Sequence, residues 1–421
     1  MFMDIRKIKI TGLFGEINHV IDLSDSITII MGDNGVGKTV VLSIIRSIFE
    51  DDFRTLLSFE FAKVEVWFKN RKDGRLTYIK EGEDKVRIES SSKDNAAFAV
   101  SADDIAVSVP SSVHEISPNK WMDVRMHMIL NLDELRQYYG SDIFEVSEEV
   151  LPDWYKRLFA NSKVHMIGTQ RLFQISNNGR RGVYLKVLTY SRQLADYISS
   201  ELSNAGKYSA ELDRTFPMRL VSQLRGHKKY EYNELVEELE RLERTRSQMS
   251  EVGFMDKINE AIDMDAILTA NQDKTLQNVI RLYINDSNKK IDKYQEAADK
   301  VSLFLNIINR RLSSKMISVN SDKGFVVSSL KDLNRVIPLE RLSSGEQNEI
   351  VLFYDLIFNC DKCSLVLIDE PEISLHLEWL QQMLGDFKEI VKQNGMKMLI
   401  ATHSPDFVGD NYDLVQNLTY E

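Results

Sequence analysis

The 421-residue chain has few cysteines and no long apolar segment. Its two cysteines, Cys360 and Cys363, cannot build a disulfide framework. No apolar run approaches the roughly 18 residues that a membrane-spanning helix needs. The first ten residues, MFMDIRKIKI, lack the apolar core of a signal peptide. These absences favour a cytoplasmic protein with no membrane partner.

Basic residues are also fewer than acidic ones. The chain has 53 Lys and Arg residues and 64 Asp and Glu residues, for a net charge of −11. The body as a whole is therefore not an electrostatic clamp for DNA. Local basic clusters keep nucleic-acid binding open, with a solvated surface as the alternative. The clusters are Arg180-Arg181 and the group Arg214, Arg219, Arg225, Lys228 and Lys229. The length allows two or three domains.

The most informative segment is 32–39, GDNGVGKT, which fits the phosphate-binding pattern G-x-x-x-x-G-K-[ST]. An apolar strand, 26–31, precedes it, and an apolar stretch of helical length, 40–49, follows it. In such a loop the backbone N–H groups and the helix N-terminus surround phosphates. Lys38 is expected to reach the β- and γ-phosphates and Thr39 to hold Mg²⁺. The alternative is a glycine-rich turn with an exposed lysine. The predicted nucleotide contacts are Asp33, Asn34, Gly35, Val36, Gly37, Lys38, Thr39 and Val40.

Two further apolar strands end in polar residues that suit nucleotide hydrolysis. Segment 364–371, SLVLIDEP, ends in Asp369 and Glu370. Asp369 is expected to hold Mg²⁺, and Glu370 to act as general base on the attacking water. Segment 398–405, MLIATHSP, delivers His403, which could hydrogen-bond the γ-phosphate region. The alternatives are a solvated acidic turn and a structural histidine.

A fourth motif, LSSGEQ at 342–347, opens an apolar helix expected over 348–358. A Ser-Gly pair at a helix start presents a hydroxyl group, bare N–H groups and a positive dipole end to an anion. By itself the motif forms a simple helix cap as often as not. The candidate nucleotide contacts here are Ser343, Ser344, Gly345 and Glu346.

The remaining patterns outline the elements around these motifs. Alternating polar and apolar residues predict a hairpin about the turn GLFG at 12–15, and more antiparallel strands beyond it. Residues 90–120 look like a loop-rich insertion. The other expected elements are strands at 61–68, 76–79, 164–167, 316–319 and 324–328, and helices at 132–139 and 146–159.

Residues 190–311 have a mostly helical pattern, with Gly226 and Gly253 as expected breaks. Apolar residues from Ile291 to Ile308 alternate steps of three and four, which is either a short heptad seam or ordinary helix packing. We expect three parts: 1–175 with the phosphate loop, a helical insertion at 185–312, and 313–421 with the later motifs.

Along the chain the motifs follow one another as phosphate loop, Gln170, LSSGEQ, the Asp369-Glu370 strand and His403. This order resembles the head of ABC-type ATPases. Three features place the resemblance in the soluble SMC/RecF/OLD-like branch (AAA_15/AAA_21-like). They are the asparagine in GDNGVGKT, the segment IDEPEISLH and the segment ATHSPDF. It implies an α/β P-loop head with a mixed parallel core sheet and an antiparallel sheet, carrying a helical, partly coiled-coil-like insertion. ATP and Mg²⁺ are the implied cofactors. Gln170 matches the family's Q-loop. The resemblance implies that Gln170 contacts Mg²⁺ together with Thr39 and Asp369. It also implies a catalytic role for Gln170 alongside Glu370 and His403.

The resemblance also implies an assembly in which two heads enclose ATP. The phosphate loop of one copy would face Ser344 and Gly345 of the other, in a homodimer or higher homo-oligomer. Segment 374–376, SLH, would fall at the family's D-loop, which crosses the dimer interface. Phe14 either touches adenine or packs in the core.

The expected role is a nucleotide-switched ATPase of an anti-phage defence system, since the chain resembles the ATPases of PARIS, Septu and retron systems. No stretch resembles the Toprim nuclease of the OLD branch, so we expect a separate effector such as a Toprim-type nuclease. Nucleic acid or a phage protein are further candidate partners. A DNA-repair or recombination ATPase of RecF or SMC type, with DNA-stimulated hydrolysis, is the main alternative. The large helical insertion argues against a transporter subunit, and the Cys360–Cys363 pair supplies only two of the four ligands of a zinc hook.

Overall fold

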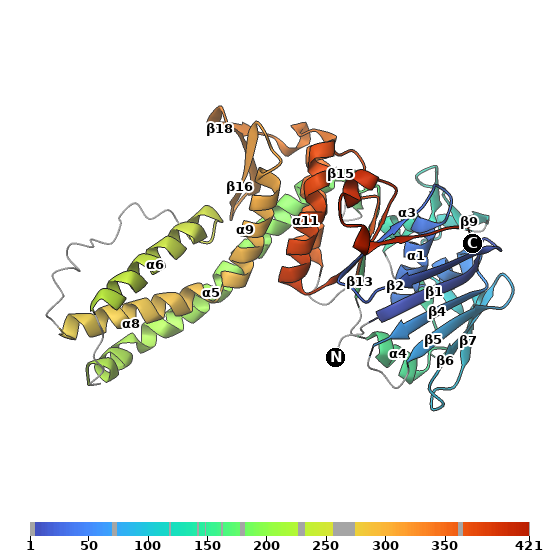
Figure 1. The fold of residues 1–421 in the computed structure, drawn as a ribbon, viewed down its shortest axis with the longest axis horizontal. Helices are drawn as coiled ribbons and strands as arrows, with labels where there is room; N and C mark the ends of the chain where they lie inside the picture. Colours follow the sequence, from blue (N-terminus) through green and yellow to red (C-terminus); the bar gives the residue numbers. More distant parts are fainter. Residues whose placement is uncertain are drawn as a thin grey trace. The chain divides into compact units, whose positions relative to one another are not determined.

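The computed structural model describes the chain except for residues 1–4, 70–73, 118, 141–142, 148, 161–162, 177–181, 226–231, 256–273, 361–364 and 421. Its internal contacts divide it into two compact units (Figure 1). The first comprises residues 1–186 and 354–421, and the second residues 187–353. Segment 313–353, which we assigned from sequence to the C-terminal part of the head, falls in the second unit together with the long helices.

A five-stranded parallel sheet in the first unit carries the sequence motifs. Its order is β13-β19-β20-β3-β21, and every neighbouring pair is parallel. The strands are β3 (Ile27–Met31), β13 (Val164–Ile167), β19 (Leu365–Asp369), β20 (Lys397–Thr402) and β21 (Val415–Asn417). β19 is buried along its whole length, as an apolar run in a covered parallel sheet should be. The strands expected before the three motifs are confirmed, and their carboxyl ends share one edge.

The six-stranded antiparallel sheet of this unit has the order β2-β1-β4-β5-β6-β7 and is drawn in blue and cyan in Figure 1. β1 (Ile5–Leu13) and β2 (Ile17–Asp22) form the expected hairpin, and β2 alternates buried and exposed residues. The inward residues pack in one core with the helices α1 (Lys38–Phe49) and α2 (Phe53–Ser58). The other strands are β4 (Lys63–Phe68), β5 (Arg75–Lys80), β6 (Lys85–Ser90) and β7 (Phe98–Ser101).

Residues 90–120 are not the loop-rich insertion that the sequence predicts. They contain β7, β8 (Ile105–Val107) and β9 (Val113–Ser117), and β9 continues into a three-stranded sheet with β10 (Lys120–Asp123) and β11 (Met128–Asn131). The strands are too short to show a pattern. β7 and β8 contribute Val100 and Ile105 to the main core, whereas β9, β10 and β11 pack around a small separate core that includes Val113, Trp121 and Leu130.

Helix α3 (Leu132–Tyr139) is confirmed, whereas the helix predicted over 146–159 is correct only in its second half. α4 begins at Asp153 and ends at Phe159. The preceding residue, Pro152, has extended backbone angles. Val146 belongs instead to β12 (Phe144–Val146), which pairs with β8. The apolar residues before Pro152 were therefore assigned to the wrong element.

The second unit contains the long helices and a three-stranded sheet. The helices are α5 (Lys186–Arg225), α6 (Tyr232–Glu251), α8 (Lys274–Ile291) and α9 (Gln295–Asn309). The strands β16 (Lys315–Asn320), β17 (Gly324–Ser329) and β18 (Asp332–Ile337) pair in that order. The expected break at Gly253 is confirmed, with φ +82° just after α6, whereas Gly226 lies outside the described residues.

The apolar stripe from Ile291 to Ile308 is buried, but it does not lie on one continuous helix. α8 ends at Ile291 and α9 begins at Gln295, with a turn between them. A heptad seam through this turn is therefore wrong, and ordinary packing explains the buried residues. α10 (Ser344–Tyr354) continues into a π-helical turn, Asp355–Asn359. Together they include all of the helix expected over 348–358 and begin four residues before it.

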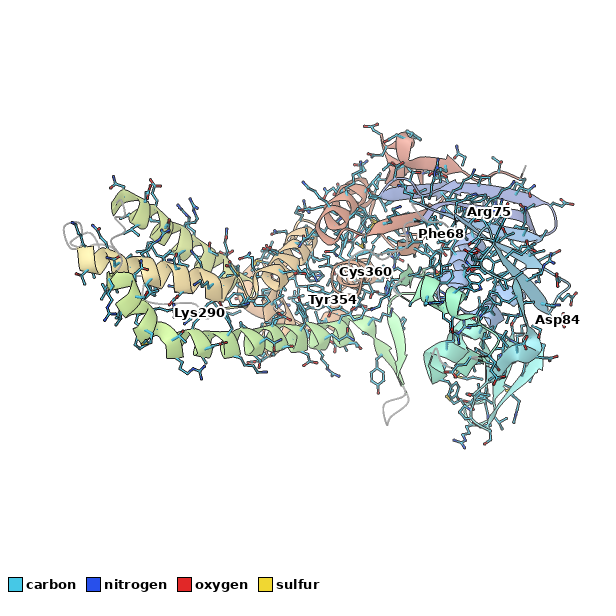
Figure 2. The ribbon with its side chains drawn as sticks, turned by 90° about the horizontal axis from the view of Figure 1, so that it is seen from below. Phe68, Arg75, Asp84, Lys290, Tyr354 and Cys360 are labelled. Atoms are coloured by element: carbon cyan, nitrogen blue, oxygen red, sulfur yellow. The ribbon has the colours of Figure 1, made fainter. Side chains whose placement is uncertain are left out.

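Two basic residues join α5 to α8, and one of them, Arg219, belongs to the second basic cluster. The Arg219 guanidinium on α5 bonds the Asp286 carboxylate on α8. Lys290 on α8, labelled in Figure 2, donates to Asp213 on α5 at 2.7 Å. Arg180, Arg181, Lys228 and Lys229 lie outside the described residues. Within the described part of the chain, no helix is both long and apolar enough to cross a membrane.

Candidate nucleotide site

The phosphate-loop segment connects β3 to α1 in a conformation that requires glycine. Gly35 and Gly37 have φ values of +94° and +90°, in the left-handed region that favours glycine. A Cβ atom on Gly37 would lie 2.8 Å from Leu13 Cδ2 and 3.1 Å from Phe14 Cε2. The hairpin turn GLFG thus packs directly against the loop. α1 begins at Lys38, so its N-terminal N–H groups open on the loop.

Lys38 is buried and its ammonium group lies within the loop itself. Its Nζ donates to the carbonyl oxygens of Gly32 at 2.7 Å and Asp33 at 3.0 Å. The far side of the loop is anchored by the buried His19, whose Nε2 lies 2.8 Å from Val36 O. The loop is therefore preformed, with a cation and a helix N-terminus in place for phosphate oxygens.

Asp369, at the end of β19, faces Thr39 at the start of α1. The Thr39 hydroxyl donates to Asp369 Oδ2 at 2.9 Å. Burial raises the pKa of the Asp369 carboxyl, as do Glu370 and Glu372, while Thr39 and Lys38 oppose the shift. Among the described residues, Asp369 Oδ1 is buried with no hydrogen-bond partner. An unpartnered carboxylate oxygen beside a hydroxyl group fits a Mg²⁺ ion or its water.

This pair supplies only part of a coordination shell. Within the described residues, no group of three or more His, Cys, Asp or Glu side chains is placed to hold a metal ion. Magnesium at phosphate sites uses one or two protein ligands, phosphate oxygens and water. The observed pair therefore matches a metal that arrives with a nucleotide better than a resident metal.

Glu370 has a left-handed backbone, with φ +46°. Its N–H donates to Ala401 O at 2.9 Å. Arg171, which is 2% exposed, donates from Nη2 to the carbonyl oxygens of Glu370 at 3.1 Å and Pro371 at 3.2 Å. The guanidinium group thus holds the turn that directs the Glu370 carboxylate out of the sheet edge.

His403 follows β20 and faces the same turn. Its Nδ1 lies 3.4 Å from Glu370 Oε1 and 3.4 Å from Glu372 Oε1. Its side chain is 48% exposed, whereas that of Glu372 is 7% exposed. The structure therefore brings Thr39, Asp369, Glu370 and His403 to one edge of the sheet, as their positions after parallel strands predict.

Gln170 follows β13, which pairs with β19, so it emerges at the same edge. Its side chain is exposed. Arg171 comes next in the chain and binds the Glu370–Pro371 backbone. The Q-loop position is therefore tied to the acidic motif through its neighbour, a role that the sequence interpretation missed.

The LSSGEQ motif lies in the second unit and forms a complete helix cap. Ser343 N and Oγ donate to Glu346 Oε2 at 2.8 and 3.0 Å, and Glu346 N donates to Ser343 Oγ at 3.3 Å. Lys315 Nζ also binds both oxygens of Glu346, at 2.7 and 2.8 Å. Burial opposes the shift, but these bonds outweigh it and lower the pKa of the Glu346 carboxyl. The Glu346 side chain is thus committed to the cap, while the N-terminus of α10 begins at Ser344.

Three secondary expectations have mixed outcomes. Phe14 is 45% exposed beside the phosphate loop, so simple core packing is wrong. Ser374 in the predicted D-loop segment has a left-handed φ of +65°. Cys360, labelled in Figure 2, is a buried cysteine, and Cys363 lies outside the described residues.

Glu372 is the second residue that the sequence interpretation missed. It sits two residues after Glu370, inside the quoted segment IDEPEISLH, so proximity to the motif was a usable signal. In the structure it contacts the end of β20, and these long-range contacts leave no local pattern.

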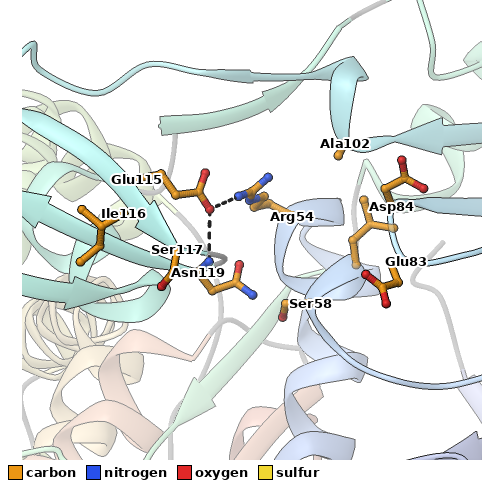
Figure 3. A pocket seen from close by; sticks show the side chains of 10 residues that line it. Arg54, Ser58, Glu83, Asp84, Ala102, Glu115, Ile116, Ser117 and Asn119 are labelled. Atoms are coloured by element: carbon orange, nitrogen blue, oxygen red, sulfur yellow. Dashed lines mark hydrogen bonds and ion pairs between the residues drawn. The ribbon is translucent and has the colours of Figure 1, made fainter.

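A separate polar pocket of about 530 Å³ lies elsewhere in the first unit (Figure 3). It contains an ion pair in which Arg54 Nη2 lies 2.5 Å from Glu115 Oε1, and Asn119 N donates to the same oxygen at 3.2 Å. None of the predicted nucleotide residues lines it. Its lining residues are Arg54, Leu57, Ser58, Glu83, Asp84, Ala102, Glu115, Ile116, Ser117 and Asn119.

Comparison with known proteins supports the reading of the motifs. A protein-family model described as "AAA ATPase domain" matches residues 3–408. The spermidine/putrescine import ATP-binding protein PotA of Aster yellows witches'-broom phytoplasma (strain AYWB) is 28% identical over 137 residues, 32% of this chain and 31% of that protein. The phosphonates import ATP-binding protein PhnC of Mycoplasma capricolum is 31% identical over 125 residues, 27% and 48% of the two chains. The chain thus spans less than half the length of these relatives.

A solved structure of similar extent is the Smc head domain of Pyrococcus furiosus, with an extended coiled coil, bound to the C-terminal domain of ScpA. Its sequence is 12% identical, the alignment covers 100% of this chain and 94% of that chain, and the TM-score is 0.41.

Proposed function

Because the chain belongs to the AAA ATPase domain family, we propose that it binds ATP with Mg²⁺ and hydrolyses it to ADP and phosphate. One observation carries the proposal. The glycine loop, the Thr39–Asp369 pair and the Glu370–His403 pair all follow strands of one parallel sheet and meet at its carboxyl edge. This is where open α/β sheets bind ligands.

In this proposal the loop from Asp33 to Val40 surrounds the triphosphate. The N–H groups of the loop and of the first turn of α1 donate to phosphate oxygens. Lys38 exchanges its bonds to the Gly32 and Asp33 carbonyls for the β- and γ-phosphates, since its ammonium group is already inside the loop. Phe14, half exposed beside Gly37, offers a ring face for the adenine.

Magnesium would be held by the Thr39 hydroxyl and by Asp369, with Gln170 as a further contact from the neighbouring strand. The ion would neutralise charge on the β- and γ-phosphates. The buried, unpartnered Asp369 Oδ1 supports this assignment.

Glu370 would accept a proton from the attacking water as the water oxygen bonds to the γ-phosphorus. The bond from that phosphorus to the β–γ bridging oxygen would break, so that ADP leaves. Its carboxylate is partly exposed, at 26%, and is directed from the strand end by the left-handed backbone. His403 lies against that carboxylate and would keep it oriented toward the reacting phosphate. A positioned general base contributes roughly a hundredfold to ten-thousandfold in rate.

We further propose that the site is completed by a second copy, whose Ser343, Ser344, Gly345 and Glu346 close on the γ-phosphate. The support is local: α10 begins at Ser344 with its N–H groups at the helix end, and Glu346 is held in the cap. A helix start of this kind binds an anion without rearrangement.

The nucleotide state would control a separate effector in an anti-phage system. The support is the chain order, since the helical unit begins shortly after Gln170 and Arg171 and returns just before Asp369. A nucleotide-sensitive turn could therefore bias the helices. Purification of a tagged chain with and without ATP tests this, and a chain that works without any protein partner would contradict it.

Replacement of the proposed base gives the direct test of hydrolysis. Glu370→Gln should retain ATP binding and lower kcat by at least about a hundredfold, because the amide cannot take the proton. Glu378→Gln on the exposed surface of α11 (Leu377–Asn394) is the matched control and should hydrolyse normally. Normal turnover by Glu370→Gln would refute the assignment.

A further inference from the structure

A buried carboxylate beside the acidic pair has no role in the reaction as described so far. Glu372 lies in the turn after β19, and its side chain is only 7% exposed. Among the described residues its Oε2 has no hydrogen-bond partner. A buried, partly unsatisfied carboxylate typically costs about 1–3 kcal/mol, so its presence calls for an explanation.

The other oxygen of this carboxylate binds the end of β20 at three points. Glu372 Oε1 accepts from the Thr402 hydroxyl at 2.6 Å and from the His403 backbone N–H at 3.2 Å. It also lies 3.4 Å from His403 Nδ1. The Thr402 hydroxyl, which is fully buried, accepts in turn from Ser404 N at 3.0 Å. The backbone and the ring of His403 are thus fixed by one acceptor.

These contacts also determine how His403 faces Glu370. The same Nδ1 lies 3.4 Å from Glu370 Oε1 and 3.4 Å from Glu372 Oε1, so this edge of the ring faces the acidic pair. The opposite nitrogen, Nε2, then points away from the acidic pair. Glu372 is thus a carboxylate that contacts both the backbone N–H and the ring of His403.

We propose that Glu372 is a positioning residue for ATP hydrolysis, which, together with Thr402, holds His403 against the Glu370 carboxylate. The inference rests on the proposed function. Glu372 acts through His403, so its loss should affect the chemical step more than nucleotide binding. The competing explanation is structural, in which Glu372 only ties the turn after β19 to β20.

Thr402 provides a matched pair of variants. Thr402→Val keeps the shape of the side chain and removes the hydroxyl group, whereas Thr402→Ser keeps the hydroxyl group and removes a methyl group. If the hydroxyl network positions His403, Thr402→Val should lower kcat by about tenfold or more with KM for ATP within about twofold, and serine should restore most of the loss. If only packing matters, serine should be the worse replacement.

A double-mutant cycle tests the route through His403. Glu372→Ala should lower kcat about tenfold or more in the wild-type chain and have little further effect in a His403→Ala background. Equal effects in both backgrounds would overturn the inference, as would wild-type kcat in Glu372→Ala or Thr402→Val. Should Glu372→Ala not fold, the near-isosteric Thr402 pair still decides the question. Absence of turnover in the wild-type chain would instead refute the proposed function.

Discussion

The Glu370 backbone and the Arg171 side chain depend on each other at the scale of single residues. A non-glycine residue in the left-handed region costs roughly 1 kcal/mol or more, and such residues persist where the surroundings hold them. Glu370 has a φ of +46°, and Arg171 Nη2 bonds both its carbonyl oxygen and that of Pro371. The direction of the proposed base therefore depends on an arginine at the Q-loop position.

Replacement of Arg171 by methionine should disturb this turn. We expect kcat for ATP to fall about tenfold or more, because the Glu370 carboxylate is no longer directed by this turn, with ATP affinity nearly unchanged. Steady-state kinetics and a nucleotide-binding titration measure the two quantities. Arg157→Met, at an exposed position on α4, is the control, and equal kinetics for both variants would argue against the role of Arg171.

A second residue, Asp51, is a half-buried acid just after the phosphate-loop helix. It follows the end of α1 with φ +54° and contacts Tyr155, whose hydroxyl lies 3.0 Å from that of Tyr78. Both tyrosines are completely buried. Burial raises the pKa of the Asp51 carboxyl from 3.8 to about 6, while the hydrogen bond from Tyr155 opposes the shift.

The raised pKa of Asp51 makes stability depend on pH. Between its unfolded and folded values the folded chain binds more protons, so the free energy of unfolding falls as pH rises through this window. Asp51→Asn should therefore stabilise the chain above the folded pKa, by at most about 3 kcal/mol, and lose its advantage below pH 4 or so. Thermal unfolding across pH measures this, with the exposed Asp25→Asn as control. A pH-independent difference would contradict the prediction.

Among the elements of the second unit, β17 and α5 meet at one close contact. Ser191 on α5 accepts from Phe325 N at 2.8 Å and donates to Lys323 O at 3.1 Å. Gly324 lies between them with φ +69°, and a Cβ atom there would be 1.8 Å from Ser191 O. The strand can approach the helix only because this residue has no side chain.

Gly324→Ala should therefore separate β17 from α5 and lower the thermal midpoint by several degrees or more. Gly253→Ala is the matched control in the same unit. Its φ of +82° imposes similar backbone strain, but its Cβ would only reach ordinary contact, 3.4 Å from Val319 O. Calorimetry on both variants separates the clash from the strain. Equal shifts would mean that the close contact matters little.

The sequence predicted some elements better than others for physical reasons. β3, β19 and β20 are apolar runs that end in a motif, so composition and chemistry agree on them. The strands between Phe98 and Asn131 were missed because each is short. The small core around β9, β10 and β11 also draws single residues from several segments. The helix predicted over 146–159 ignored Pro152, which precedes the true start at Asp153.

The residues of the candidate site also differ in how far the sequence predicts them. Lys38, Thr39, Asp369, Glu370 and His403 could be predicted, because each stands at a fixed spacing from a strand or a glycine loop. The contacts of Arg171 and Glu372 could not be predicted, because they join groups that are far apart in the sequence. Arg171 bonds the Glu370 carbonyl, and Glu372 bonds the Thr402 hydroxyl and the His403 N–H. Positioning groups of this kind become visible only when the neighbouring strands are seen together.

Over the whole molecule, the proposed ATPase motifs are divided between two compact units. The phosphate loop, Gln170, Asp369, Glu370 and His403 belong to the first unit, and the LSSGEQ helix begins in the second. Under the proposal that two copies share each triphosphate, every site would take its lysine from the first unit of one chain and its serine from the second unit of the other.

Mixing two variants tests that claim most directly. Lys38→Ala removes the lysine of the loop, and Ser344→Arg blocks the helix start of α10. Each variant alone should be inactive, and mixing the two should recover ATP turnover, because a mixed dimer contains one site with Lys38 from one chain and Ser344 from the other. Full turnover by Ser344→Arg alone, or no recovery from confirmed mixed dimers, would contradict a shared site.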